Sequence, residues 1–526
     1  MLSDFTRVAN EIAATTKKSV KERALADYLV TLDDASLERA VVFFSGAPFP
    51  RREQRVTGVG WSTIADAVAE ATGKSLDELW EIYPKYADLG DAVAELYGDA
   101  GGTVTLSEVG ETFDRISAAS GSEKKTVLVG LLRKLDGQGA RFVVKILQNE
   151  IRIGLQEGLV ESAIAKAFGR ELDAVRRANM FTGDIGAAAL LAKGDALSSA
   201  KMSLFHPFAF MLAQPEEDPS EIVAALGEDA VADDKYDGIR AQIHAGGDTV
   251  RIYSRTLDDV THRFPEIEQA ARSLGRPMIL DGEIVAFSDR ILPFAVIQTR
   301  LGRKKISEKL LAEAPVVFFA FDLLYDGDEP LFERPLRERL ARLREILGAP
   351  VSSPAPVLPG VKVGAGGDTG APKILLGHQS PVRDAAHIDE LFDAARARAN
   401  EGLVVKDPAS VYTPGRRGKS WLKYKKALAT LDCVVTAAQY GNGKRRAVLS
   451  DLTFAVRRDG ELVNIGKAYS GLTDVEIEKL TEHFKATTTA RYGPVHTVEP
   501  QIVLEIAFDR IQQSSRHKSG YALRFP

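Results

Sequence analysis

The stretch V-A-D-D-K-Y-D-G-I-R, from Val231 to Arg240, places a lysine, a carboxylate, a glycine and an arginine within six residues behind a short apolar lead. An ordinary lysine is protonated near neutral pH, and it can attack phosphorus only where burial or neighbouring cations favour the neutral amine. Arg240 could supply such a cation and hold an anionic substrate. Gly238 lets the backbone turn and approach closely because it has no Cβ. Taken alone, K-x-D-G also fits a surface turn of mixed charge.

The length and composition of the chain limit what it can be. A chain of 526 residues is too long for one ordinary core and favours about two to four domains. Apolar residues make up 45% and charged residues 27%, as in soluble globular proteins. No apolar run reaches the length of a membrane span, so we expect a cytoplasmic protein. The net charge of −5 means that any DNA binding must come from local basic patches.

Residues 1–202 carry apolar side chains at helical spacing, for example Leu2, Phe5, Val8 and Ile12. Strand-like alternation is scarce in this region, so the sequence predicts an all-helical domain. The pair Phe43-Phe44 could belong to a clamp-binding peptide, but packing in the core is the favoured interpretation.

Residues 203–427 differ in composition from residues 1–202, and strand-like runs become frequent from Arg251 onward. The segments Met278–Phe287 and Val316–Tyr325 are predicted as buried strands of an α+β domain. A carboxylate within so apolar a run as the first needs a partner, because a buried unpaired charge is costly. A metal ion or a ribose hydroxyl would serve. The Pro- and Gly-rich segment 349–372 is predicted to be a surface loop.

Residues 428–526 are predicted to form strands separated by Gly-rich turns. Large apolar residues alternate from Ile502 to Phe508, as in a half-buried strand. The size and strand content suit a small Greek-key barrel of the OB type. The segment Gly441–Arg446 is predicted to be a basic hairpin that touches a phosphate backbone.

The K-x-D-G-x-R pattern resembles the nucleotidyl-transfer motif of DNA ligases, RNA ligases and capping enzymes. Further segments resemble the companion motifs of the family in the expected order: S-R at Ser254-Arg255, D-G-E at Asp281–Glu283, F-D-L at Phe321–Leu323, E-G-L-V-V-K at Glu401–Lys406, R-R-G-K-S-W-L-K-Y-K-K at Arg416–Lys426 and R-H-K-S-G-Y-A-L-R-F-P at Arg516–Pro526. Ile151–Gly169 resembles the N-terminal DNA-binding domain of archaeal and eukaryotic-type ATP-dependent DNA ligases. The chain thus resembles that ligase family, and its compactness favours a bacterial or archaeal member.

The resemblance implies three domains and a reaction. It assigns residues 1–202 to a helical DNA-binding domain, residues 203–427 to an adenylation (nucleotidyltransferase) domain and residues 428–526 to an OB-fold domain. The implied reaction seals nicks in double-stranded DNA with ATP, through lysyl-AMP and DNA-adenylate intermediates, during replication, repair or recombination.

The resemblance also implies roles for individual residues. Lys235 would be the nucleophile, and Glu283 and Glu401 would bind Mg²⁺. The residues implied to contact the nucleotide are Asp233, Arg240, Arg255, Glu283, Phe321, Arg417 and Lys423. Phe321 would stack on the adenine ring, and Lys423 would contact the α-phosphate. Arg516 and Lys518 would bind the β- and γ-phosphates. Asp233 stands where the family often has glutamate, and this shorter acid would still help to orient adenine.

The implied partner is nicked double-stranded DNA, and a sliding clamp or other repair proteins are candidate partners of a nucleoid-associated monomer. NAD⁺ is disfavoured as the AMP donor because NAD-dependent ligases carry a four-cysteine zinc module and this chain has only Cys433. An RNA ligase or capping enzyme is the alternative enzyme, which the helical N-terminal domain disfavours. A non-catalytic DNA-binding scaffold is the alternative from another class.

Overall fold

The computed structural model describes residues 1–86, 88–98, 101–227, 229–303, 305–348, 373–426, 429–441, 445, 447–508, 510–514, 516–524 and 526. These residues form two compact units, 1–214 with 220–423 and 215–219 with 424–526. The predicted domain limit at 427 lies close to this division, whereas the predicted limit at 202 falls inside the first unit, and both limits stay predictions. The predicted surface loop 349–372 lies outside the described residues. None of the described helices is long and apolar enough to span a bilayer.

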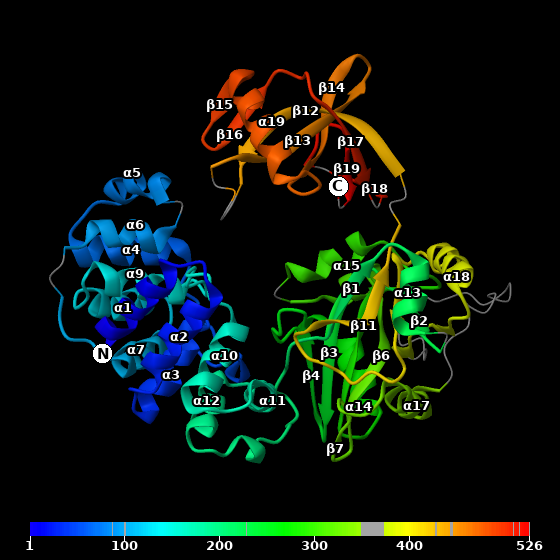
Figure 1. Cartoon of the computed structure of the whole chain (residues 1–526), viewed down its shortest axis with the longest axis horizontal. Coiled ribbons are helices and arrows are strands. Elements are labelled where there is room, and N and C mark those ends of the chain that lie inside the picture. The colour runs from blue at the N-terminus through cyan, green and yellow to red at the C-terminus, as the bar shows by residue number, and fades with distance from the viewer. Residues whose placement is uncertain are drawn as a thin grey trace. The chain divides into compact units, whose positions relative to one another are not determined.

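Helices build the N-terminal part of the first unit, as the sequence predicted (Figure 1, blue to cyan). They are α1 (Leu2–Ala13), α2 (Lys18–Leu29), α3 (Asp34–Phe44), α4 (Trp61–Thr72), α5 (Leu76–Tyr86), α6 (Leu89–Leu96), α7 (Leu106–Ala118), α8 (Glu123–Leu132), α9 (Gly137–Leu147), α10 (Glu157–Phe168), α11 (Leu172–Thr182) and α12 (Ile185–Lys193). The four apolar residues predicted to line one face of α1 are all buried. Phe43 and Phe44 are fully buried as well, and the ring centroids of Phe44 and Phe5 lie 4.3 Å apart. Core packing of this pair is therefore confirmed.

Two sheets form the central part of the first unit. Their strand orders are β1-β11-β10-β2-β9 and β4-β3-β5-β6-β7, with β8 parallel to β6. The strands of the first sheet are β1 (Leu212–Glu216), β2 (Val231–Lys235), β9 (Gln379–Pro381), β10 (Gly402–Lys406) and β11 (Arg417–Tyr424). Those of the second are β3 (Ile239–Gly246), β4 (Thr249–Ser254), β5 (Met278–Ala286), β6 (Val316–Asp326), β7 (Glu329–Pro330) and β8 (Ile374–Leu376). The two segments that the sequence predicted to be buried strands are β5 and β6, so this prediction is confirmed.

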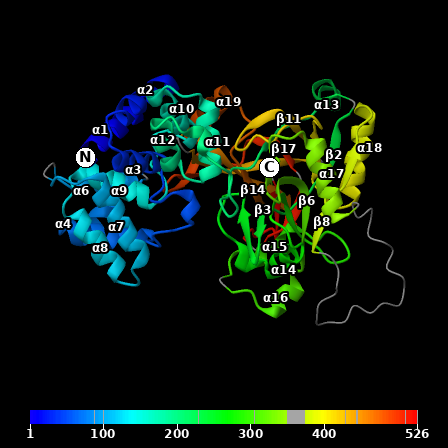
Figure 2. The same ribbon diagram turned by 90° about the horizontal axis from the view of Figure 1, so that it is seen from below.

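The helices of this part are α13 (Pro219–Leu226), α14 (Pro265–Ser273), α15 (Phe294–Leu301), α16 (Glu308–Glu313), α17 (Leu336–Leu347) and α18 (Ala385–Ala397). Of these, α14, α15, α17 and α18 pack against the sheets. Helix α17 packs against β6 and β8, and α18 packs against β2 and β10 (Figure 2). A buried ion pair anchors α17, because Arg339 Nε donates to Asp322 Oδ1 of β6 at 2.7 Å and neither side chain is exposed. Since a charge left alone there would be costly, this pair fixes how α17 lies on the sheet.

The turn from Tyr236 to Gly238 joins β2 of the first sheet to β3 of the second. The Tyr236 ring stacks on Phe319 of β6, with ring centroids 4.4 Å apart and an interplanar angle of 5°. Its hydroxyl accepts a hydrogen bond from the His378 N–H at 2.8 Å. The ring and the hydroxyl of Tyr236 therefore both attach the turn to the structure behind it.

Strands begin earlier than the sequence predicted, since β1, β2 and β3 all precede Arg251. The sequence did not predict β3, because Arg240, Gln242 and His244 occupy one face of this strand and interrupt the apolar pattern expected of a buried strand. Gln242 and His244 are nevertheless fully buried. The polar atoms of these two side chains need hydrogen-bond partners, and the backbone of Phe205 and Phe208 provides them.

The second unit is rich in strands, as predicted. Its larger sheet has the order β14-β13-β12-β16-β15, β17 pairs with β12, and β18 pairs with β19. The elements are β12 (Ala429–Tyr440), β13 (Leu449–Arg458), β14 (Glu461–Ala468), α19 (Asp474–Ala486), β15 (Thr488–Tyr492), β16 (Val495–Val498), β17 (Val503–Phe508), β18 (Arg510–Gln513) and β19 (Tyr521–Arg524). Most of the predicted basic hairpin 441–446 lies outside the described residues.

His244 on β3 is buried in its neutral form. Burial lowers the pKa of His244 to about 3, and the charge of His206 adds to this effect. Nδ1 of His244 accepts the Phe205 N–H at 3.1 Å, so Nε2 carries the proton and lies 3.3 Å from Gln242 Oε1. Phe205 has a φ of 68°, a left-handed conformation that is uncommon for a residue with a Cβ.

We expect the free energy of unfolding to fall as the pH drops below about 6.5, because a histidine in the unfolded chain has a pKa near that value. Since the folded-state pKa of His244 is lowered, the unfolded chain binds more protons in this range. The stability is fully present above about pH 6.5 and is lost towards about pH 3, at about 1.4 kcal/mol per pH unit. Denaturant unfolding of wild type and H244Q between about pH 7 and pH 5 measures this, since glutamine can still accept the Phe205 N–H. Equal pH slopes for the two proteins would contradict it.

Candidate active site

Lys235 is the last residue of β2 and lies opposite Gly402 of β10 in an antiparallel pair. The Glu401 N–H donates to the Lys235 carbonyl oxygen at 2.8 Å. The Lys235 ammonium forms an ion pair with the Glu401 carboxylate, and the two side chains are 25% and 6% exposed. The expected neighbouring cation, Arg240, is bound to another carboxylate.

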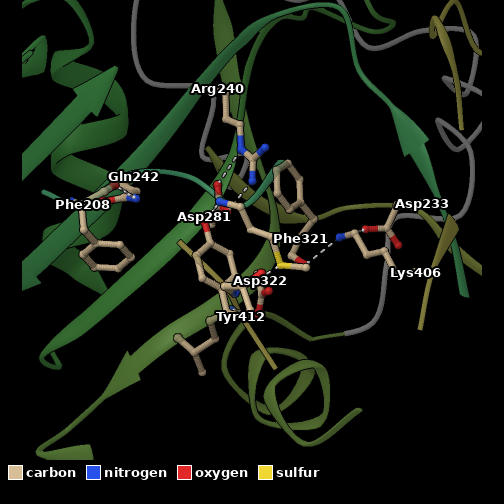
Figure 3. A network of polar contacts seen from close by, with 12 residues as sticks. Phe208, Asp233, Arg240, Gln242, Asp281, Phe321, Asp322, Lys406 and Tyr412 are labelled. Atoms are coloured by element: carbon tan, nitrogen blue, oxygen red, sulfur yellow. Dashed lines mark hydrogen bonds and ion pairs between the residues drawn. The ribbon is translucent and has the colours of Figure 1, made fainter. Parts of the chain in front are cut away.

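Arg240 on β3 binds Asp281 of β5 through both carboxylate oxygens, with Nε to Oδ1 at 3.1 Å and Nη2 to Oδ2 at 2.8 Å (Figure 3). The Tyr412 hydroxyl donates to the same Oδ2 at 2.8 Å. The guanidinium carbon of Arg240 lies 4.9 Å from the ring centroid of Phe210 and 5.4 Å from that of Phe321. Because Asp281 is fully buried, its charge requires such partners. Arg240 is thereby held in one direction beside the ring that is predicted to stack on adenine.

Glu283 on β5 lies opposite Arg240, two residues from Asp281 on the same face of the strand. Burial raises the pKa of Glu283 to about 8; Lys235 and Arg240 oppose this shift and Glu401 adds to it. No group of three or more acidic, histidine or cysteine side chains in the described ranges could hold a metal by itself. One or two carboxylates with substrate phosphates commonly bind Mg²⁺. The two carboxylates of Glu283 and Glu401 match this ligand set for Mg²⁺.

A second ion pair lies two residues before the lysine. Asp233 of β2 pairs with Lys406 of β10, and both side chains are at most 3% exposed. Lys406 Nζ lies 4.2 Å from the ring centroid of Trp421 and 4.6 Å from that of Phe321. Burial raises the pKa of Asp233 to about 6, although Lys406 lowers it. Oδ1 of Asp233 has no hydrogen-bond partner in the described part of the chain, so one acceptor stays available near Phe321.

The structure gathers six predicted site residues on or directly beside β2 and β10 of the first sheet and β3, β5 and β6 of the second: Asp233, Lys235, Arg240, Glu283, Phe321 and Glu401. Arg255 directly follows β4 and Arg417 begins β11, and both side chains are exposed. Lys423 lies near the end of β11 and is partly buried. In the second unit, Arg516 and Lys518 are exposed in the loop between β18 and β19.

Three family models match the chain in order. They are DNA ligase N terminus over residues 1–165, ATP dependent DNA ligase domain over 210–425 and ATP dependent DNA ligase C terminal region over 445–526. A probable DNA ligase of Koribacter versatilis is 47% identical, over 98% of this chain and 90% of its own length. The chain belongs to the ATP-dependent DNA ligase family.

A DNA ligase of Methanoculleus marisnigri is 35% identical to this ligase, over 99% of this chain and 93% of its own length. The solved structure named Pmar-Lig_PreS3 has a TM-score of 0.61 at 16% identity, covering 99% of this chain and 98% of that one, and this likeness concerns the fold. The predicted family, and its order of helical, adenylation and strand-rich parts, are confirmed. The match of a DNA ligase N terminus counts against the RNA ligase and capping enzyme alternative.

Sequence reasoning missed Asp281, Tyr412 and Phe210 as neighbours of Arg240. Asp281 could have been found, because the rule that a carboxylate in an apolar strand needs a partner applies to it as well as to Glu283. Tyr412 and Phe210 lie in segments without strand or helix periodicity. They reach Arg240 only through tertiary packing.

Gly238 leaves no room for a side chain, since an added Cβ would lie 2.2 Å from the Ile284 carbonyl oxygen. We expect Gly238→Ala to lower the free energy of unfolding by roughly 1–3 kcal/mol, because a backbone atom of a central strand cannot move aside. Lysyl-adenylate formation should also slow, because the turn that positions Lys235 shifts. Denaturant unfolding and labelling with ATP measure the two effects. Gly302→Ala is the matched control, since a Cβ there meets nothing within 4 Å. Identical behaviour of the two variants would show that the close approach does not constrain the turn.

Proposed function

We propose that Lys235 of this ligase takes AMP from ATP, and that the site passes the AMP to the 5′-phosphate of a nick in double-stranded DNA. The placement of Lys235 carries this proposal. The lysine ends β2 in contact with Glu401. Glu283 lies close enough to both residues for their charges to affect its pKa. Arg240 and the Phe321 ring lie beside each other in the second sheet. A nucleophile, two carboxylates, a fixed cation and an aromatic ring are the groups that nucleotidyl transfer needs.

The reaction has three phosphoryl steps. The Lys235 amine bonds to the α-phosphorus of ATP while the bond to pyrophosphate breaks. An oxygen of the 5′-phosphate at the nick then replaces the amine, which gives a DNA adenylate. The 3′-hydroxyl attacks the 5′-phosphorus, AMP leaves, and a phosphodiester bond remains. Each step places negative charge on phosphoryl oxygens, so positioning and charge stabilisation dominate the catalysis.

Lys235 must lose a proton before it attacks, because only the neutral amine is nucleophilic. Glu401 accepts a hydrogen bond from the ammonium and so orients the Lys235 side chain; as a ligand of Mg²⁺ it would stay a carboxylate. Arg240 would contact the nucleotide beside Phe321. The exposed Arg255 and Arg417 would reach the nucleotide or nick phosphates, and Lys423 the α-phosphate.

Glu283 and Glu401 would hold Mg²⁺ together with the substrate phosphates. The ion would supply positive charge to the phosphoryl oxygens where negative charge develops. Because burial raises the pKa of Glu283 to about 8, this side chain has to give up a proton near neutral pH to become a ligand. Arg516 and Lys518 of the second unit would bind the β- and γ-phosphates in the first step.

Further properties belong to the same proposal. The helical part, including residues 151–169, would hold the DNA around the nick by phosphate contacts, which position without reading sequence. The protein would act as a monomer at the nucleoid in the cytoplasm, in replication, repair or recombination, with a sliding clamp or other repair proteins as partners. Phe43 and Phe44 are buried, so a clamp would have to bind another segment.

Lys235→Ala should abolish covalent labelling by α-phosphate-labelled ATP with Mg²⁺ in the absence of DNA. The wild type should retain acid-stable label, because the phosphoramide bond needs the Lys235 amine. Lys309→Ala, which removes a side chain that is 84% exposed, is the matched control and should label as wild type does. Label on the Lys235→Ala protein would assign the nucleophile to another residue.

Asp233→Asn should weaken the preference for ATP over GTP in the labelling step. Oδ1 of Asp233 can accept from the exocyclic amine of adenine, whereas guanine presents an acceptor oxygen at that position. Asparagine can offer its NH₂ group to that oxygen. We expect the preference to fall by about tenfold, the size of one hydrogen bond. Rates of label transfer from each nucleotide measure it, with the exposed Asp289→Asn as control. An unchanged preference would remove Asp233 from base recognition.

A further inference from the structure

Residues 205–212, here called the linking segment, run along the polar face of β3 that ends in Arg240. Alternate residues of a strand share a face, so Arg240, Gln242 and His244 point to the same side. Each side chain contacts a different point of the linking segment: His244 binds Phe205, Gln242 binds Phe208 and Arg240 lies against the Phe210 ring. Figure 3 shows the Gln242 contact, in which Nε2 donates to the Phe208 carbonyl oxygen at 2.7 Å, and the Arg240 end of the same row.

Tyr412 ties the other end of the linking segment to the carboxylate that holds Arg240. Its hydroxyl accepts the Met211 N–H at 3.0 Å and donates to Asp281 Oδ2 at 2.8 Å. Tyr412 is 2% exposed and Asp281 is fully buried, so neither group can exchange its partner for bulk water. One hydroxyl therefore joins the backbone of the linking segment to the Asp281–Arg240 pair.

These contacts would be a costly way to pack a connecting segment. An apolar face on β3 would cover the segment without the desolvation of Gln242, His244 and the Tyr412 hydroxyl. The left-handed Phe205 adds backbone strain, which persists only where the surroundings impose it. Buried polar networks that are fully bonded specify one geometry. The geometry specified here is the direction of the Arg240 guanidinium.

We propose that Tyr412 is a positioning residue for nucleotide binding. Through Asp281 it fixes Arg240, and through Met211 it makes that position depend on the linking segment. The linking segment follows the helical part of the chain, so the position of Arg240 depends on how the chain leaves that part. The inference rests on the proposed contact of Arg240 with ATP. Tyr412 acts on the nucleotide only through Arg240.

Tyr412→Phe tests this role, because it removes the hydroxyl and keeps the buried ring. The measurement is single-turnover formation of lysyl-AMP by the full chain over a range of ATP concentrations. Loss of a hydrogen bond to a charged group should raise the half-saturating ATP concentration by about tenfold. The rate at saturating ATP should change much less, because Lys235 and Glu401 are untouched.

Tyr253→Phe is the matched control. The Tyr253 hydroxyl donates to the Phe205 carbonyl oxygen at 2.8 Å, and the residue is 2% exposed. It thus holds the same linking segment from an equally buried site without a bond to Asp281. Both variants should lose a similar amount of thermal stability, but only Tyr412→Phe should change the ATP dependence. Equal ATP dependences in the two variants would overturn the inference.

Arg240→Lys separates this inference from the proposed function. If Tyr412 acts through Arg240, adding Tyr412→Phe to Arg240→Lys should raise the half-saturating ATP concentration no further. Additive effects in the double variant would overturn the positioning role. An unchanged ATP dependence of Arg240→Lys itself would instead overturn the proposed contact of Arg240 with ATP. Should Tyr412→Phe not fold, Phe210→Leu tests the same row, because it removes the ring beside Arg240; an unchanged ATP dependence there would count against the inference.

Discussion

The turn from Tyr236 to Gly238 has to carry the chain between two sheets in three residues, and the site depends on this constraint. The stack of Tyr236 on Phe319 and the carbonyl oxygen of Ile284 behind Gly238 allow the backbone one path. The strand before the turn then fixes Lys235 against β10, and the strand after it fixes Arg240 against β5. A slip of one residue in either pairing would turn those side chains to the opposite face.

Ion pairs in the two sheets, and between a sheet and helix α17, decide which charges stay available to a substrate. Three buried carboxylates each have a cation: Asp233 with Lys406, Asp281 with Arg240 and Asp322 with Arg339. Removal of one partner would leave a buried charge at a cost of roughly 3–5 kcal/mol, so these pairs specify geometry more than they add stability. Glu283 differs from them, because it forms no ion pair among the described residues and burial raises its pKa to about 8, which favours the protonated form near neutral pH.

Much of the fold followed from local patterns in the sequence. Apolar periodicity identified the helices of the N-terminal part and the strands β5 and β6, and the motif series led to the family and to Lys235. β3 was missed because periodicity assumes that buried residues are apolar, whereas Gln242 and His244 are buried to hold the linking segment. The motif series also led to Glu283 and Phe321, and the structure places both beside Arg240; their roles stay predictions.

The sequence by itself determined the order of the parts, the reactive motif and the class of chemistry, because these depend on neighbouring residues and on spacing along the chain. The tertiary structure decided which partner each charge has. Lys235 meets Glu401 across 166 residues of sequence, and Arg240 meets Asp281 and, through it, Tyr412. Such pairings depend on strand register and on packing between distant segments, and no local pattern encodes them.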